Sequence, residues 1–333
     1  MRRIAMVLFA TAALVAPAAA HHSPAAFDTS SQVTFQGRIA RVDWTSPHTY
    51  VYVENTTTGK AVVWMLETDS VPILTRSGWT KEALAVGTKV TVRANPDKDP
   101  RRMHALLVSM ALPTGVVLTP RAGGGSNGAK ATSIAGVWNG LRGFTERRVT
   151  GFKPTAKGAA AIQAYTVAAN PTARCVAYAT PFLTGMPHLN QVEVGKDTVV
   201  IRNEFFSVDR TVYIDGRGHP KDGPRTNQGH SIGHWDNGAL VVDTTLFADH
   251  PLGNYTGNAG AERRELPSGP RKHTVERFQL SDDKTRLLIS AVVEDPDYLA
   301  EPFTVNMEWD YTPQLPMLRF GCTPEEAQRY LFR

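Results

Sequence analysis

Histidines at a predicted cleavage point are the strongest candidates for metal chemistry in this sequence of 333 residues. If a signal peptidase cuts after Ala20, His21 offers an α-amine and an imidazole to one ion, and a cut one residue earlier makes His22 the third residue. Nitrogen ligands of this kind suit Cu(II), which lies highest in the divalent affinity order. His48, at a predicted strand start, is the expected third ligand, with His104 as second choice. The alternative is a frayed terminus that holds no metal.

A second set of polar residues in the later part of the chain is suited to ligand binding or acid–base chemistry. The expected ligand-binding residues are Arg210, Asp215, His219, His230 and Glu276. The candidates for catalysis are His219, His230 and Asp243, with the two histidines as acid and base. The alternative is that these residues hold turns and cap strands, as Asp215 does in part in an Asp-Gly turn.

The residues Gly229-His-Ser-Ile-Gly233 spell the Gly-x-Ser-x-Gly pattern of serine hydrolases. That pattern needs a strand before the serine and a helix after it, whereas here the chain runs into another predicted strand. We therefore do not expect Ser231 to be a nucleophile. His230 and His234 have the helical spacing of a metal pair, but in an extended chain they stand about 13 Å apart, too far to share an ion.

The amino terminus has the three parts of an export signal. Arg2 and Arg3 are followed by the apolar stretch 4–16 and by small residues up to Ala20, so we expect residues 1–20 to be removed and the protein to be periplasmic or secreted. No later apolar run reaches the ~18 residues of a membrane helix, and we expect no membrane insertion of the mature chain.

The charge balance is mild, since loss of Arg2 and Arg3 lowers the formal net charge from +5 to +3. A nucleic-acid partner is therefore not expected, although Trp44, Tyr50 and Tyr52 are aromatic residues of a kind that stacks on bases. We expect a small molecule as the partner instead.

The sequence contains two cysteines, Cys175 and Cys322. In an oxidising compartment an isolated pair favours a disulfide. Such a bond would close a loop worth about 5 kcal/mol in the chain-entropy account. Two buried free thiols are the alternative.

Strand patterns divide the chain into two β domains. Between residues 32 and 112, three strands, a short helix at 80–84 and two more strands follow the order of an OB-type barrel. The predicted strands of the second domain include 198–205, 210–215, 239–246, 273–280, 285–294 and 303–311, with short helices near 155–165 and 324–330. The predicted organisation is a signal peptide at 1–20, an OB-like domain at 21–113, a Gly/Ser-rich linker at 114–135 and an antiparallel barrel or sandwich at 136–333. The fold class is therefore all-β.

Sequence blocks in both domains resemble exported protein families. The segment 21–112 carries His21-His22-Ser23, Phe27-Asp28, Trp44-Thr-Ser-Pro-His48 and Gly78-Trp79-Thr80, and it resembles the exported domain of unknown function 6152. Residues 136–322 resemble a second exported family of uncharacterised, lipocalin-like proteins. The matching blocks are Arg210-x-Val-Tyr-x-Asp215-Gly216-Arg217-x-His219-Pro220, Gly229-His-Ser-Ile-Gly233-x-Trp235, Leu240-Val-Val-Asp-Thr-Thr245 and Glu276-Arg-Phe278.

These resemblances imply an exported β protein but no settled activity. We expect a binding protein without catalysis, with a small ligand inside the second barrel and Cu(II) at the amino terminus of the first domain. The alternative is a periplasmic hydrolase or lyase that uses His219 and His230 as acid and base.

Overall fold

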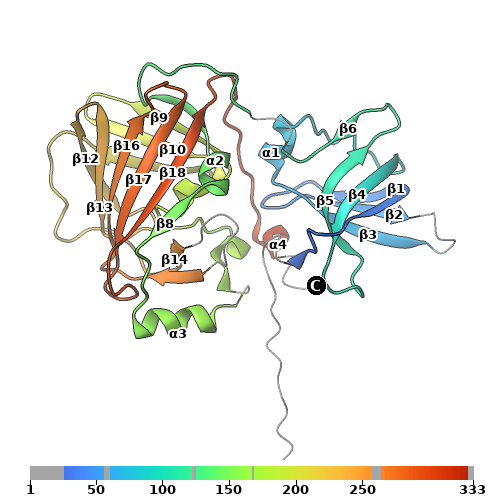
Figure 1. Ribbon diagram of the computed structural model, residues 1–333, viewed down its shortest axis with the longest axis horizontal. Helices are drawn as coiled ribbons and strands as arrows, with labels where there is room; N and C mark the ends of the chain where they lie inside the picture. Colours follow the sequence, from blue (N-terminus) through green and yellow to red (C-terminus); the bar gives the residue numbers. More distant parts are fainter. Residues whose placement is uncertain (1–25, 56–60, 122–124, 167–168, 257–263, 329–333) are drawn as a thin grey trace, which may run out of the picture.

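The computed structural model describes residues 26–55, 61–121, 125–166, 169–256 and 264–328. The predicted signal peptide and the pair His21-His22 lie outside these residues. Two β barrels stand beside each other, with the end of the chain running between them (Figure 1). No helix in the described ranges is long and apolar enough to cross a membrane.

The first barrel has the predicted OB-type order. Its sheet runs β3-β2-β1-β4-β5-β6, and pairing of β3 with β5 closes the described strands into a barrel. Gly37 lies where β1 crosses β2, and a Cβ at this position would stand 2.3 Å from the Glu54 carbonyl oxygen. The elements are β1 (Val33–Asp43), β2 (Tyr50–Asn55), β3 (Val62–Glu67), α1 (Val71–Arg76), β4 (Lys89–Pro96), β5 (His104–Ala111) and β6 (Val117–Leu118).

The helix of the first barrel lies earlier than predicted. Residues 81–84 form turns, and the helix is α1, in a stretch where the sequence pattern indicates a break. Pro72 stands in its first turn, where the missing N–H of proline is tolerated. Ile73 and Leu74 are buried, so packing against the barrel stabilises a helix of only six residues.

The second barrel is larger and closes on itself. Its sheet runs β17-β16-β13-β12-β11-β10-β9-β7-β18, with β17 paired to β18 and β8 added beside β18. Among the described strands of this sheet, only the β11–β12 pair is parallel. The strands are β7 (Gly136–Asn139), β8 (Arg148–Thr150), β9 (Leu189–Val194), β10 (Thr198–Asn203), β11 (Val208–Tyr213), β12 (His230–Asp236), β13 (Ala239–Thr245), β16 (His273–Leu280), β17 (Arg286–Glu294) and β18 (Phe303–Tyr311).

Smaller elements lie outside the sheet of the second barrel (Figure 1). A separate hairpin pairs β14 (His250–Thr256) with β15 (Arg264–Ser268). The helices are α2 (Leu141–Thr145), α3 (Ala156–Ala164) and α4 (Pro324–Ala327), and short 3-10 turns are η3 (Pro171–Arg174), η4 (Leu183–Gly185) and η5 (Phe205–Ser207). The helix predicted near 155–165 is α3, which begins after Thr155, whose hydroxyl accepts from the Gly158 N–H.

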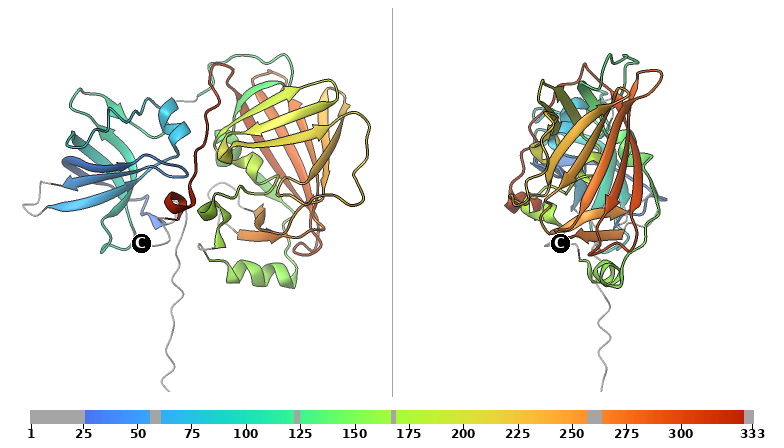
Figure 2. Two further views of the ribbon diagram at one scale, coloured as in Figure 1. Left: turned by 180° about the vertical axis from the view of Figure 1, so that it is seen from behind. Right: turned by 90° about the vertical axis from the view of Figure 1, so that its left-hand side faces the viewer.

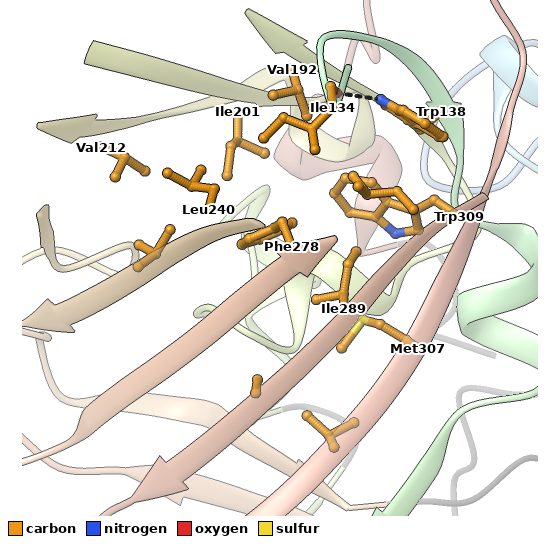
Figure 3. Close-up of a cluster of buried hydrophobic side chains, with 14 of the residues drawn as sticks. Ile134, Trp138, Val192, Ile201, Val212, Leu240, Phe278, Ile289, Met307 and Trp309 are labelled. Carbon is orange, nitrogen blue, oxygen red and sulfur yellow. Dashed lines mark hydrogen bonds between the residues drawn. The ribbon is translucent and has the colours of Figure 1, made fainter. Parts of the chain in front are cut away.

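Apolar side chains fill the interior of the second barrel (Figure 3). Trp138 and Trp309 are fully buried there, and the Trp138 indole N–H donates to the Ile134 carbonyl at 2.9 Å. Phe278 packs 6.2 Å from the Trp309 ring. The interior is therefore a packed hydrophobic core.

Buried contacts join the two barrels. Arg76 of α1 makes two hydrogen bonds to Glu204 of the second domain, at 2.6 and 2.8 Å, and both side chains are buried. The predicted disulfide is confirmed, since Cys175 is bonded to Cys322 with 5.9 Å between the Cα atoms. The backbone of Cys322 also forms an isolated β-bridge with that of Ser46 in the first domain. The final segment thus contacts both barrels, as Figure 2 shows from behind.

The ends of the predicted linker belong to the barrels. Val117 and Leu118 form β6 and pair with β5. Ala131 and Ile134 are buried in the core of the second barrel. Hydrophobic side chains at both ends of a Gly-rich stretch thus pack against their nearest barrel.

Candidate functional site

A cavity of about 620 Å³ lies between the two barrels. The first domain contributes Pro47, His48, Glu67, Asp69, Ser70 and Leu106 to its wall, among others. The second domain contributes Asn170, Tyr178, Phe182, His188, Phe205 and Leu252, among others. β3 ends at Glu67 and α1 begins after Ser70. The connection between these two elements lines the cavity.

Aromatic side chains form the apolar wall of the cavity. The Tyr178 ring lies 4.2 Å from Phe182 and 5.6 Å from Phe205, and both pairs are stacked. Leu252 packs into the same cluster. The chain around Tyr178 follows η3, where the Asn170 side chain accepts from the Thr172 N–H. The disulfide at Cys175 then ties this wall to the final segment of the chain.

His188 is a buried imidazole at the boundary between the domains. Its Nε2 lies 3.0 Å from the Ser70 hydroxyl oxygen of the first domain. Burial lowers the pKa of His188 well below 6.5, and the positive charges of Arg76 and Arg121 lower it further. The ring is therefore neutral, and its Nδ1 has no hydrogen-bond partner among the described residues.

The contact between Ser70 and His188 lacks the features of an activated nucleophile. A catalytic histidine is oriented by a third group and has a pKa near the working pH. No carboxylate of the described chain bonds His188 Nδ1, and the lowered pKa makes the imidazole a weak base. The pair can instead position hydrogen-bonding groups at the cavity wall.

Charged groups of both signs line the same cavity. The guanidinium of Arg121 makes two hydrogen bonds to Asp69, at 2.6 and 2.8 Å, and lies 5.9 Å from the Phe144 ring centroid. Two further carboxylates, Glu67 and Glu265, also reach the wall. No hydrogen bond or ion pair of the Glu265 carboxylate occurs within the described ranges.

The predicted metal candidates His48 and His104 lie on two sides of Glu67. His48 Nδ1 is 3.6 Å and His104 Nε2 is 3.4 Å from the Glu67 carboxylate. Asp97 lies 3.2 Å from His104 Nδ1, and the Phe27 ring packs 4.7 Å from the His104 ring. In the part of the chain that the structure describes, no three His, Cys, Asp or Glu side chains are placed to hold a metal ion.

The predicted acid–base residues meet on the outside of the second barrel. His219 Nε2 lies 3.0 Å from Asp243 Oδ1, and His219 Nδ1 lies 2.9 Å from His230 Nδ1. His273 adds a second imidazole, 3.1 Å from the same Asp243 oxygen. Burial lowers the pKa of His230, and His219 lowers it further. The geometry fits a hydrogen-bonded chain in which His230 donates to His219 and His219 donates to Asp243.

The remaining predicted ligand residues lie elsewhere. Arg210 and Glu276 form an ion pair inside the second barrel, where both are buried. Asp215 is in an exposed turn and pairs with Arg217 at 2.6 Å. The five predicted residues therefore occupy the barrel interior, a turn and the outer face, and none of them lines the cavity between the barrels.

Ser231 is buried within β12 and accepts a hydrogen bond of 3.0 Å from Arg210 Nε. β12 is followed by β13, not by a helix, so the expectation that Gly229-x-Ser-x-Gly233 is no nucleophile elbow agrees with the fold. The sequence pattern does not predict β12, because Ser231 and Gly233 stand at inward positions that usually hold large apolar residues.

Comparison with known sequences finds a family match for the first barrel. Residues 10–105 match DUF6152, a family of unknown function. This match confirms the resemblance of the first domain. The DUF6152 segment ends early in β5, so it carries Pro47, His48, Glu67, Asp69 and Ser70 of the cavity wall. No curated protein matches the chain.

Sequence reasoning missed the cavity. Its wall includes Arg121 of the predicted linker and His188 of a short loop, and no spacing rule connects either residue to the DUF6152 segment. One signal was available: the Trp44–His48 block of the resemblance contains Pro47 and His48, which reach the wall.

Proposed function

We propose that this chain is an exported binding protein without catalytic activity, and that it takes a small organic ligand in the cavity between its barrels. The observation that carries the proposal is the cavity itself, whose volume of about 620 Å³ is in the range of small-molecule sites. Its wall is mainly apolar with a few polar groups, which is the composition of such sites. The predicted signal peptide and the disulfide support export, because disulfides persist in oxidising compartments.

This proposal moves the ligand from the second barrel to the cavity. The barrel interior holds Trp138, Phe278 and Trp309 in one hydrophobic cluster, and the buried Arg210 and Glu276 are hydrogen-bonded to each other. The cavity instead has open volume, and polar groups such as the Glu265 carboxylate line it. A ligand can form hydrogen bonds to groups of this kind.

A mutant pair tests the proposal. Leu106 reaches the cavity from the outer side of β5, so Leu106→Trp is expected to fill part of it. Leu288→Trp, on the exposed side of β17, is the matched control. The fluorescent apolar probe N-phenyl-1-naphthylamine is expected to bind the wild type and the control saturably, and the Leu106→Trp variant at least tenfold more weakly. Equal binding by all three proteins, or no saturable binding, would contradict the proposal.

The acid–base alternative has one supporting observation, the hydrogen-bonded chain Asp243–His219–His230. A hydrolase or lyase also needs a concave site beside its acid and base. Neither histidine lines the cavity between the barrels or the small cavity beside Arg147. Binding without turnover is therefore the better supported proposal.

We also propose Cu(II) binding by the mature amino terminus, with His21, His22 and His48 as ligands. The backbone of Asp28 donates to Pro96 and that of Lys98 donates to Ala26, so the chain enters the fold close to Asp97. His22 precedes Ala26 by four residues, which limits their separation to about 14 Å.

Isothermal titration of correctly processed protein with Cu(II) tests the metal proposal. We expect submicromolar binding that weakens at least tenfold in His48→Ala, since loss of one nitrogen ligand removes a coordinate bond. His234→Ala, an exposed histidine of β12, is the control and is expected to bind as the wild type does. Micromolar binding that is unchanged in His48→Ala would refute this part.

A further inference from the structure

We infer that the ligand of the cavity between the barrels is an organic cation: a protonated amine or quaternary ammonium group on an apolar body. This inference rests on the proposed binding function and assigns the charge of the ligand. Its basis is the imbalance between the charged groups of the wall and the presence of aromatic faces beside them.

The charges of the wall leave an excess of carboxylates. Arg121 is the one lysine or arginine among the described lining residues, and Asp69 already pairs with it through two hydrogen bonds. Glu67 and Glu265 are the other two carboxylates of the wall. Glu67 has His48 and His104 nearby, but Glu265 has no charged or hydrogen-bonded partner for its carboxylate in the part of the chain that the structure describes.

An anionic ligand fits this wall poorly. Its charge would be buried near two carboxylates, and a buried charge is tolerated only with a partner of opposite sign. The guanidinium of Arg121 would have to leave Asp69 to supply one. His188 does not supply a positive charge, because its pKa is well below 6.5.

Aromatic rings supply the second half of a cation site. Tyr178, Phe182 and Phe205 line the cavity, and cations bind over aromatic faces within about 6 Å of the ring centroid. The cavity already contains one contact of this kind, since the Arg121 guanidinium lies 5.9 Å from the Phe144 centroid. A cationic group between Glu265 and the rings would meet a charge partner, and its apolar body would meet the hydrophobic wall.

A series of ligands with one skeleton and three charges tests the inference. The probes are 2-(1-naphthyl)ethylamine, 2-(1-naphthyl)ethanol and the carboxylate anion of 1-naphthaleneacetic acid. Two further series carry the same three head groups on a phenyl or an octyl body. Titrations at pH 7.5 in EDTA keep metal away from Glu67 and His48. We expect the amine to bind at least tenfold more tightly than the alcohol in one or more series, and the carboxylate to bind most weakly.

Variants locate the preference. Glu265→Gln is expected to lower affinity for the amine about tenfold and to leave affinity for the alcohol unchanged, because the amide keeps the shape and removes the charge. Glu294→Gln, at an exposed carboxylate of β17, is the control and should keep the full preference. Glu67→Gln is the second test, with a smaller loss because histidines stand beside this carboxylate.

The outcomes separate the inference from the function on which it rests. If the carboxylate or the alcohol binds as tightly as the amine in every series, or if neither Glu265→Gln nor Glu67→Gln reduces the preference, the cation inference is wrong and the binding function stands. If no probe of any charge binds, and N-phenyl-1-naphthylamine does not bind either, both are wrong.

Discussion

The interior of the second barrel is filled by its core side chains, whereas the space between the barrels is a cavity of about 620 Å³ lined mostly by residues outside the strands. Inside the barrel, Arg210 bonds Ser231, Thr244 and Glu276, whereas Glu276 Oε1 has no hydrogen-bond partner among the described residues. In the cavity, His188 Nδ1 has no partner among the described residues.

This difference shows where a ligand can act. A polar group buried without a partner costs about 1–3 kcal/mol, and such groups occur in both regions. The two regions differ in space: core side chains fill the barrel, whereas the cavity has the volume that a ligand needs. A closed β barrel therefore does not by itself indicate a ligand inside the barrel.

The largest predicted effect concerns the disulfide, which holds one wall of the cavity. The double variant Cys175→Ser/Cys322→Ser is expected to lose about 5 kcal/mol of unfolding free energy, because the bond spans 147 residues and restricts the unfolded chain. Urea denaturation measures the loss. Hydrogen exchange should rise in residues 170–188 of the cavity wall more than in β16–β18. A uniform rise in hydrogen exchange, or a loss of unfolding free energy under 1 kcal/mol, would contradict the expectation that the disulfide mainly stabilises the cavity wall.

The next effect tests the packed barrel. Arg210→Met leaves the Glu276 carboxylate buried without its partner, which is expected to cost about 3–5 kcal/mol by urea denaturation. The double variant Arg210→Met/Glu276→Leu should recover much of that stability, since no charge remains. Both proteins should bind cavity probes as the wild type does. Loss of probe binding by the stable double variant would show that the barrel interior takes part in the site.

A smaller effect concerns acid sensitivity beside the cavity. Burial lowers the pKa of His250 to about 4, and its Nδ1 accepts from the N–H of the cavity residue Leu252. Because the unfolded state takes up the proton first, stability is full above about pH 6.5 and falls as the pH decreases toward 4, by about 3 kcal/mol from this group. The pKa of His188 is lowered in the same direction.

Chemical denaturation between pH 4 and 7 measures this loss. His250→Asn should flatten the pH dependence, whereas the control His234→Asn, at an exposed histidine, should leave it unchanged. An equal slope in His250→Asn and the wild type would place the acid sensitivity away from the cavity.

The smallest effect is on the stability of the cavity variant. Leu106→Trp adds volume where space exists, so its unfolding free energy should stay within about 0.5 kcal/mol of the wild type while probe binding falls. A destabilisation above about 2 kcal/mol would mean that this wall is packed as tightly as the barrel core.

Much of the fold was predictable because its signals are local. Alternation along β1 and β2, the Gly-rich stretch after Arg121 and the turns before β13 and β17 can each be seen in a few consecutive residues. α1 and β12 were not predictable in this way. α1 depends on burial of Ile73 and Leu74 against the barrel, and β12 has small residues at inward positions.

The candidate site was predictable only in fragments. His48 stood out through its Ser-Pro-His block, and His219, His230 and Asp243 through theirs, and the last three do meet in the structure. The sequence gives no indication, however, that they meet on the outer face of the barrel and not inside it. The face on which a side chain lies depends on strand register, because a shift of one residue moves every side chain of the strand to the other face of the sheet.

The amino-acid sequence by itself determined two successive β domains, their disulfide and the relation of the first to DUF6152, because strand periodicity, cysteine count and family blocks are properties of the chain. Only the tertiary structure decided that Glu67, Arg121, His188 and Glu265 surround one cavity. These residues are brought together by barrel closure and by the Arg76–Glu204 contact between domains, and interactions over such sequence distances leave no local pattern.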